Sequence, residues 1–494
     1  MRVLQKNKNI LTVLLMISLT IFTQLLSIMK SSVVAGLFGS SSDMDAFNLS
    51  NNIVMCIFDF IAAGISTVVI PYYVKSKNNP NVDSFITILY SILFSICSLC
   101  ILFRNLLIGI LSDRDQAFVE TASNILIILI IGYYLYSISN LTAAFFQCEG
   151  KYIIPKLVNL IAQVLVVGLL LFWKEISILE YSIIFSIGFI FNFVTDLFVA
   201  LKSGWRLKIS LTIAPETKKM FSIFLPTVVS TGVYRLSLLV DATISSRLDT
   251  GKITLLSYSS QVSGLINSIF IGNLLLYFYP KIVKRIKENK GQKQFWQQVV
   301  FFHYVVCFLI VAFITVGREG ISFLFEHGKF NSNDTEAVYW GGLIYIVGLQ
   351  TNVIRDMIYR YFYALGNTKI PARNSIFVSV MNIIISLILV YLIGFYGIIL
   401  GTVLASLISL LGILRLFNKE IKFEISRKRF AASILVNIII STIVCCVLLL
   451  CKYCIFNFQS NIVNIIVLGF EGVVLFSIMT FFFNKNIITA IKNI

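Results

Sequence analysis

Long apolar segments alternate with short polar segments along almost the whole chain. A helix that crosses a lipid bilayer needs about 20 consecutive, mostly apolar residues, and fourteen segments come close to or exceed that length. The pattern therefore predicts an all-α integral membrane protein with 14 transmembrane helices. The predicted spans are 10–29, 47–74, 83–103, 122–147, 155–173, 181–201, 220–247, 254–280, 298–316, 335–363, 371–391, 394–414, 431–451 and 462–483.

The first segment begins with Arg2, Lys6 and Lys8, and a signal peptide also has a basic start. Because this segment is long enough to span a bilayer and leads into thirteen more spans, we expect an uncleaved first helix.

The composition excludes the usual soluble classes. Apolar residues make up 58% of the 494 residues, charged residues make up 13%, and the mean hydropathy is +0.90. Charged residues account for about 25% of a typical soluble domain, so too few remain here to cover a water-exposed surface. Soluble dehydrogenases, nucleases and disulfide-stapled secreted domains are therefore excluded.

The distribution of basic residues predicts the orientation. The chain has 40 Lys and Arg against 23 Asp and Glu. With the N-terminus inside, 28 basic residues fall in inward segments and 9 in outward ones, as the positive-inside rule requires. We expect a multi-pass protein of the cell membrane with both termini in the cytoplasm. The excess does not cluster on a polar domain, so no nucleic-acid partner is expected. The basic segment Lys281–Lys287 is either a topology anchor or a site for an anionic lipid or a partner protein.

Short matches between the two halves indicate an internal repeat. We expect two pseudo-symmetric six-helix lobes, related by an axis along the membrane normal, with a cavity between them. The expected parts are an N-lobe (1–201), a cytoplasmic linker (202–219), a C-lobe (220–414) and a C-terminal part with two further helices (415–494). The matching segments are 49–53 with 258–262 and 70–75 with 279–284, both 209 residues apart, and 146–155 with 362–371, 216 residues apart.

Several motifs resemble the MurJ (MviN) family of lipid II flippases, which belongs to the multidrug/oligosaccharidyl-lipid/polysaccharide exporter superfamily. The resemblance is colinear from about residue 20 to 420, and the family has fourteen spans. The motifs are Val34-Ala-Gly-Leu-Phe-Gly39, Asp45-Ala-Phe47, Gly64 with Val69-Ile-Pro71, Leu324-Phe-Glu-His-Gly-Lys-Phe330, Arg360-Tyr-Phe-Tyr-Ala364 and Thr368-Lys-Ile-Pro371.

The resemblance implies outward transport of undecaprenyl-diphosphate-linked sugar by alternating access. It also implies that basic residues in a central cavity bind the diphosphate. Lys30 matches one of these family positions. The other positions carry Gln24, the segment Cys56–Asp59 and the segment Tyr258–Gln261, so three of four expected cations are missing. This departure puts lipid II itself in more doubt than lipid-linked sugar transport in general.

Ionisable residues inside predicted spans are candidate functional residues, because a charge at bilayer depth is costly. Arg235 is either a replacement cation for the diphosphate or part of a structural ion pair with Asp59. Asp59 is a gating partner, a proton or cation site, or the partner of Arg235 or Lys30. Lys30, expected at the end of the first span, binds substrate or anchors the helix at the interface.

The other candidates have similar alternatives. Asp45 either belongs to a gate or caps the second span, and Asp241 either holds an outer-gate contact or is a satisfied polar position. Asp356 and Arg360 have the i,i+4 spacing of a local ion pair. Arg355 has no acidic residue three or four positions away, which makes it the second candidate substrate-binding cation.

The chain carries no P-loop, no catalytic set and no metal-ligand spacing around its two histidines. We therefore predict a monomeric transporter with no enzyme activity and no cofactor, and the sequence does not identify a coupling ion. Its partners are membrane lipids and a lipid-linked saccharide with an anionic diphosphate, most plausibly the peptidoglycan precursor. A flippase for a capsule or exopolysaccharide precursor, a cation-coupled multidrug antiporter and a non-transporting scaffold remain alternatives.

Overall fold

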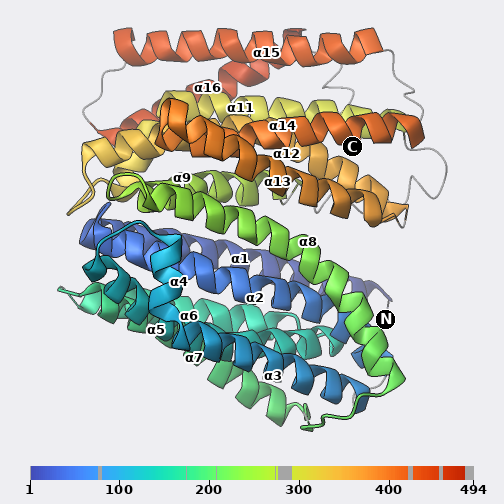
Figure 1. Ribbon diagram of the computed structural model, residues 1–494. Coiled ribbons are helices and arrows are strands. Elements are labelled where there is room, and N and C mark those ends of the chain that lie inside the picture. Colours follow the sequence, from blue (N-terminus) through green and yellow to red (C-terminus); the bar gives the residue numbers. More distant parts are fainter. Residues whose placement is uncertain are drawn as a thin grey trace. The chain divides into compact units, whose positions relative to one another are not determined.

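The computed structural model describes residues 2–75, 80–173, 175–206, 208–272, 274–275, 292–365, 367–420, 427–455 and 460–483. Every regular element in these ranges is a helix (Figure 1). Eleven helices of the described part are long and apolar enough to cross a membrane. The three further predicted spans, 47–74, 220–247 and 254–280, include residues or side chains outside the described set. The all-α, membrane-spanning class is thereby confirmed.

The chain forms two compact units, Met1–Thr254 and Leu255–Ile494. In the first unit, α2 packs against both α5 and α8, α7 packs against α5 and α6, and α1 packs against α6. The helices of this unit are α1 (Arg2–Phe38), α2 (Ser42–Lys75), α3 (Pro80–Leu102), α4 (Arg104–Leu111), α5 (Gln116–Cys148), α6 (Ile153–Phe172), α7 (Ile178–Lys202) and α8 (Pro215–Ser246).

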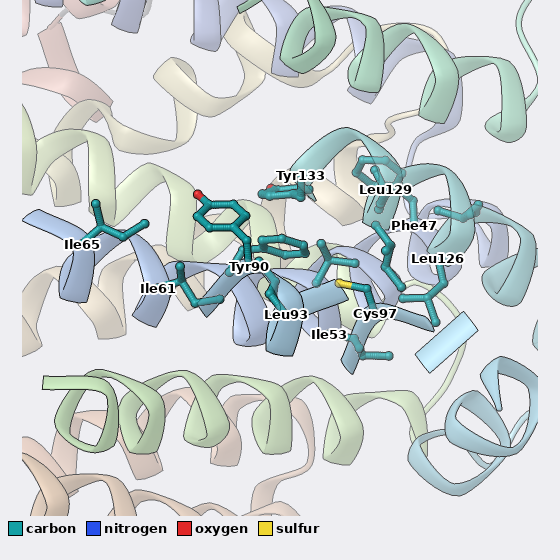
Figure 2. Packing of buried hydrophobic residues seen from close by; sticks show 14 of the residues in the cluster. Phe47, Ile53, Ile61, Ile65, Tyr90, Leu93, Cys97, Leu126, Leu129 and Tyr133 are labelled. Carbon is teal, nitrogen blue, oxygen red and sulfur yellow. The ribbon is translucent and has the colours of Figure 1, made fainter. Parts of the chain in front are cut away.

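The core of the first unit lies among α2, α3 and α5. Figure 2 shows Phe47 and Ile53 of α2 near Leu126 of α5, with Leu93 and Cys97 of α3 beside them. Because side chains three or four positions apart share one helix face, the buried positions of α3 follow that spacing and place one face against its neighbours. The opposite face of α3 exposes large apolar side chains such as Phe94 and Leu99, as a lipid-facing helix requires.

Polar residues fix several helix ends. Ser177 and Glu180 form a capping box at the start of α7, and Asn331 and Asp334 form another at the start of α12. Each box satisfies backbone N–H groups that have no partner within the helix. Asp115 caps α5 by accepting a hydrogen bond from the Phe118 N–H. Of these three helices, α12 carries the candidate residues Arg355, Asp356 and Arg360.

In the second unit, α11 packs against α12, α15 and α16, while α14 packs against α12 and α13. The connection α9 begins within the last residues of the first unit and continues into the second. The elements are α9 (Lys252–Ile266), the π-helical η1 (Asn267–Gly272), α11 (Gln292–Phe325), α12 (Ser332–Ala364), α13 (Lys369–Ile393), α14 (Phe395–Glu420), α15 (Arg427–Leu450), the π-helical η2 (Cys451–Ile455) and α16 (Asn461–Phe483).

The boundary of the first span differs from the sequence-based expectation. The first span was expected at 10–29, but α1 continues to Phe38 and its apolar part is Ser18–Phe38. Lys30 therefore lies inside the helix, about two turns before its end, because Val33–Phe38 keeps the chain apolar and helical. The helix α8 packs on α2 within the first unit, and the assignment of residues 220–414 to a second lobe stays a prediction.

One repeated segment occupies equivalent places in the two units. Residues 146–155 connect α5 to α6, and residues 362–371 connect α12 to α13. Both therefore form the turn between consecutive long helices. The basic segment Lys281–Lys287 and the repeat copy at 279–284 lie outside the described residues.

Candidate functional site

Arg235 and Asp59 form an ion pair between α8 and α2 in the first unit. The side chains are 25% and 29% exposed, respectively, so the ion pair is partly accessible to solvent or to a ligand. This pairing is one of the two alternatives that the sequence left open for Arg235. A guanidinium has five N–H donors, and one carboxylate does not occupy all of them. Arg235 can therefore remain bound to Asp59 and still offer donors to an anionic ligand.

Aromatic and amide side chains of α5 and α2 surround this pair. The Tyr133 hydroxyl donates a hydrogen bond to Asn51 Oδ1 at 3.0 Å. The ring of Tyr133 contacts the ring of Phe58, the residue directly before Asp59. Tyr136 lies on the same helix as Tyr133 and interacts electrostatically with Asp59. The setting of the pair is thus partly apolar, which strengthens any charge-assisted hydrogen bond formed there.

Lys30 lies elsewhere in the first unit, where α1 meets α6 and α7. Its ammonium group lies 4.7 Å from the centre of the Phe185 ring, a cation–π contact. It lines a cavity of about 80 Å³ together with Gln163 of α6 and Asn192 of α7. Among the described residues, Lys30 makes no ion pair with a carboxylate. It is therefore a half-buried cation with a small cavity of mixed polar and apolar lining beside it.

Asp45 is fully buried in the first turn of α2 and binds the start of α9. Its Oδ2 accepts a hydrogen bond from the Gly251 N–H at 2.7 Å. Its Oδ1 accepts from the N–H and the hydroxyl of Thr254 at 2.9 and 2.8 Å. A carboxylate at a helix N-terminus satisfies free N–H groups and meets the positive end of the helix dipole. Asp45 therefore caps α9, whereas the sequence-based alternative was a cap of α2.

Arg114, which was not among the candidate residues, completes this network. Its guanidinium lies 3.5 Å from Asp45 Oδ2. It also donates hydrogen bonds to the carbonyls of Ser246 and Asp249 and to the Thr250 hydroxyl, at 2.7, 3.1 and 2.9 Å. One arginine thus binds most of the loop between α8 and α9. No sequence spacing indicates this role, because the partners lie more than 130 positions away.

The cations of the second unit are close to hydroxyl and carboxyl groups. Arg355 donates a hydrogen bond to the Ser406 hydroxyl at 3.2 Å, and its Nε lies 3.9 Å from Asp356 Oδ1. Asp356 is about half exposed and also interacts electrostatically with Arg360. The acid is thus shared between Arg355 and Arg360, whereas the i,i+4 spacing indicated a pair with Arg360 alone.

Asp241 is buried in α8, two turns after Arg235. The sequence analysis passed over Asp196 of α7, which is also buried. The rule that selected Asp59 and Arg235, an ionisable residue inside a predicted span, also applied to Asp196 in the span 181–201. In the second unit, an ion pair between Lys452 and Glu319 was likewise not anticipated, since the partners lie far apart in sequence.

Comparison with known proteins gives a consistent family match. The family model described as lipid II flippase MurJ matches residues 34–468. A relative described as a probable lipid II flippase MurJ, from Buchnera aphidicola subsp. Acyrthosiphon pisum (strain APS), is 24% identical, and the match covers 97% of this chain and 98% of the relative.

Solved structures show a similar fold. A structure of lipid II flippase MurJ in an inward closed conformation has a TM-score of 0.83 at 22% identity, covering 96% of this chain and 100% of the other. An inward-facing multidrug resistance MATE family transporter of the MOP superfamily has a TM-score of 0.63 at 15% identity, covering 85% and 98%. At these identities, the likeness concerns the fold alone.

Proposed function

Because the chain belongs to the lipid II flippase MurJ family, we propose that it moves lipid II from the inner to the outer leaflet of the cell membrane. The family match over most of the chain carries this proposal. The protein is a transporter rather than an enzyme, and its working environment is a membrane, since eleven of its described helices have the length and composition of spans.

We assign substrate binding to Lys30, Arg235 and Arg355. A diphosphate group needs N–H donors that bind phosphate oxygens, and guanidinium groups offer them in pairs. Arg235 supports the assignment because its pair with Asp59 is partly exposed, and Lys30 because it lines a small cavity together with two amide side chains, Gln163 and Asn192. Asp45, Asp59, Asp241, Asp356 and Arg360 would then act in gating or ion pairing.

The full architecture proposed is 14 membrane-spanning helices, arranged as two six-helix lobes with two further helices at the C-terminal end. Both termini lie in the cytoplasm, and the protein works as a monomer by alternating access. The distribution of basic residues supports the orientation. An anion moved outward across an inside-negative membrane gains about 2.3 kcal/mol per charge per 100 mV, so the membrane potential favours the proposed direction.

Translocation of fluorescently labelled lipid II in reconstituted vesicles tests the role of Arg235. Losing a hydrogen bond to a charged group costs about 1.5–3 kcal/mol, so we expect Arg235→Gln to slow translocation about tenfold or more. The matched variants are Asp59→Asn and the double variant. If Arg235 binds substrate, the double variant stays slow. If the pair is only structural, removing both charges restores transport, and our assignment of Arg235 is wrong.

A second candidate is a flippase for another lipid-linked polysaccharide precursor. It is favoured by Gln24 and by the absence of basic residues in the segments 56–59 and 258–261, where the family resemblance implies cations. Expression in cells depleted of their own lipid II flippase separates the two. Rescue of growth supports lipid II as substrate. Failure of a correctly inserted protein to rescue growth, together with transport of another lipid-linked saccharide, supports the second candidate.

A further inference from the structure

Asp196 is a carboxylic acid buried within the first unit. It lies in α7, five residues before the end of the predicted span 181–201, and its exposed fraction is only 3%. Neither substrate binding nor the Asp45 network uses it. A buried carboxyl group at this depth requires a cation, several hydrogen-bond donors or a proton.

The neighbours of Asp196 do not provide a counter-charge. Two hydroxyl groups of α5 interact with it: that of Ser139 by a side-chain hydrogen bond and that of Tyr136 electrostatically. Within the described part of the chain, Asp196 forms no ion pair, and its buried Oδ1 has no hydrogen-bond partner. Asp196 thus differs from Asp45 and Asp59, since each of those acids meets an arginine.

The charged and polar groups of the surrounding helices are engaged elsewhere. Arg235 of α8 pairs with Asp59 of α2, and the Lys30 ammonium of α1 lies over the Phe185 ring. On α6, the Lys156 ammonium donates a hydrogen bond to the Thr20 hydroxyl. On α7 itself, Lys202 lies over the Phe198 ring at 4.2 Å.

Uncharged groups complete the surroundings. Asn192, one turn before Asp196, donates its amide hydrogen to the Gly188 carbonyl, and Tyr133 of α5 is bound to Asn51. Gln163 of α6 presents a buried Oε1, which is another acceptor without a partner in the described residues. An ionised Asp196 would therefore place a negative charge beside hydroxyl groups alone, with no cation among the described residues to balance it.

A proton is the ligand that fits this place. A protonated carboxyl group is neutral and has an O–H donor of its own, which the Ser139 oxygen can accept. A metal cation would need several oxygen ligands at once, and the described residues contain no cluster of three or more acidic, His or Cys side chains that could hold a metal ion.

We propose that Asp196 is a proton-binding site, loaded in the conformation seen here, and that release of this proton is coupled to the transport cycle. Binding converts the carboxylate and a proton into the neutral acid, with no change in oxidation state. Release requires water to reach the packed surface between α5 and α7. The coupling rests on the proposed transport function, whereas proton binding itself does not.

Infrared spectroscopy of the purified full-length protein tests proton binding without any transport. We expect a carbonyl stretch of a protonated carboxyl group at neutral pH, absent in Asp196→Asn and shifted in frequency in Asp196→Glu. Asp59→Asn is the matched control: Asp59 has an arginine partner, so its removal should leave the band unchanged. If Asp196→Asn leaves the band unchanged, or if the wild type has no such band at neutral pH, Asp196 is ionised and the proposal is overturned.

Transport under an imposed pH gradient tests the coupling. In vesicles that contain labelled lipid II, we expect the gradient to change the wild-type rate and to have no effect on Asp196→Asn, which cannot exchange a proton. Equal gradient dependence in both proteins overturns the coupling. If the wild type moves no lipid II at all, the proposed function fails, while the infrared result still decides whether Asp196 binds a proton.

Discussion

Buried acids in the first unit are neutralised in different ways. Asp45 accepts hydrogen bonds from Gly251 and Thr254 and also meets Arg114. Asp59 is paired with Arg235 across two helices, and Asp196 meets no cation in the described residues, where its Oδ1 also has no hydrogen-bond partner. These arrangements correspond to different roles: holding the start of a helix, keeping an arginine in place, and binding a proton.

The loop bound by Asp45 depends on a glycine at position 251. Gly251 has φ +88°, and a Cβ there would lie 2.5 Å from the Ser40 carbonyl oxygen. Gly204 has φ +89° with open space around its Cα, which makes it a matched control. We expect Gly204→Ala to lower stability by about 1 kcal/mol through its backbone conformation. Gly251→Ala should cost at least about 1 kcal/mol more, because the backbone must also move.

Thermal unfolding of the two glycine variants in detergent measures this difference. Equal losses of stability would show that the close approach to Ser40 contributes nothing. A larger loss at Gly251 would show that the chain must pass close to the end of α1 for Asp45 to reach the Gly251 N–H.

At the scale of elements, the last two long helices are held to α11. Lys452 in η2 forms an ion pair with Glu319 at 2.7 Å and donates a hydrogen bond to the Thr315 carbonyl at 2.6 Å. These two side chains are only 13% and 11% exposed. Lys452 thus binds η2, which follows α15, to α11. Near it, the Arg318–Glu336 pair is 47% and 46% exposed.

These two pairs should differ strongly in their contribution to stability. Removing one partner of a buried pair costs about 3–5 kcal/mol, whereas an exposed pair contributes about 0–1 kcal/mol. We expect Lys452→Met to lower the unfolding temperature clearly and Glu336→Gln to change it little. The double variant Lys452→Met/Glu319→Leu should recover much of the loss, since no charge is then left buried. Thermal unfolding in detergent measures these changes. Equal effects of the two single variants would show that the buried pair contributes no more to stability than the exposed pair.

At the scale of the whole molecule, the distribution of charge predicts the orientation in the membrane. The basic residues are concentrated on one predicted side. Cys454, at the end of η2, is exposed and lies on the opposite side in this scheme. Lys218, in the first turn of α8, is exposed and lies on the basic side. A pair of residues on opposite sides of the membrane is therefore available for a direct test.

Labelling with a membrane-impermeant maleimide tests the orientation. In a variant that retains Cys454 as its sole cysteine, we expect labelling in intact cells. In a variant whose sole cysteine is Lys218→Cys, labelling should require permeabilised cells. The reverse pattern would show that the termini lie outside the cytoplasm, and labelling of both in intact cells would contradict the proposed number of spans between them.

The sequence by itself determined the all-helical class, the membrane environment and the family. These follow from local properties of the sequence. A membrane span needs only a continuous apolar run, and each family motif comprises only a few neighbouring residues. The sequence also marked Arg235, Asp59 and Lys30 as unusual, since charge at bilayer depth is costly wherever the chain folds.

Only the tertiary structure decided what each charge contacts. Asp45 binds residues more than 200 positions away, and Arg114, which seemed an ordinary loop charge, holds the same loop. Asp59 meets Arg235 but Asp196 meets no cation in the described residues, although both looked alike as acids within apolar helices. Apolar periodicity determines which residues form helices. Helix packing decides which charged groups meet, because that pairing depends on distances between helices, which no sequence pattern specifies.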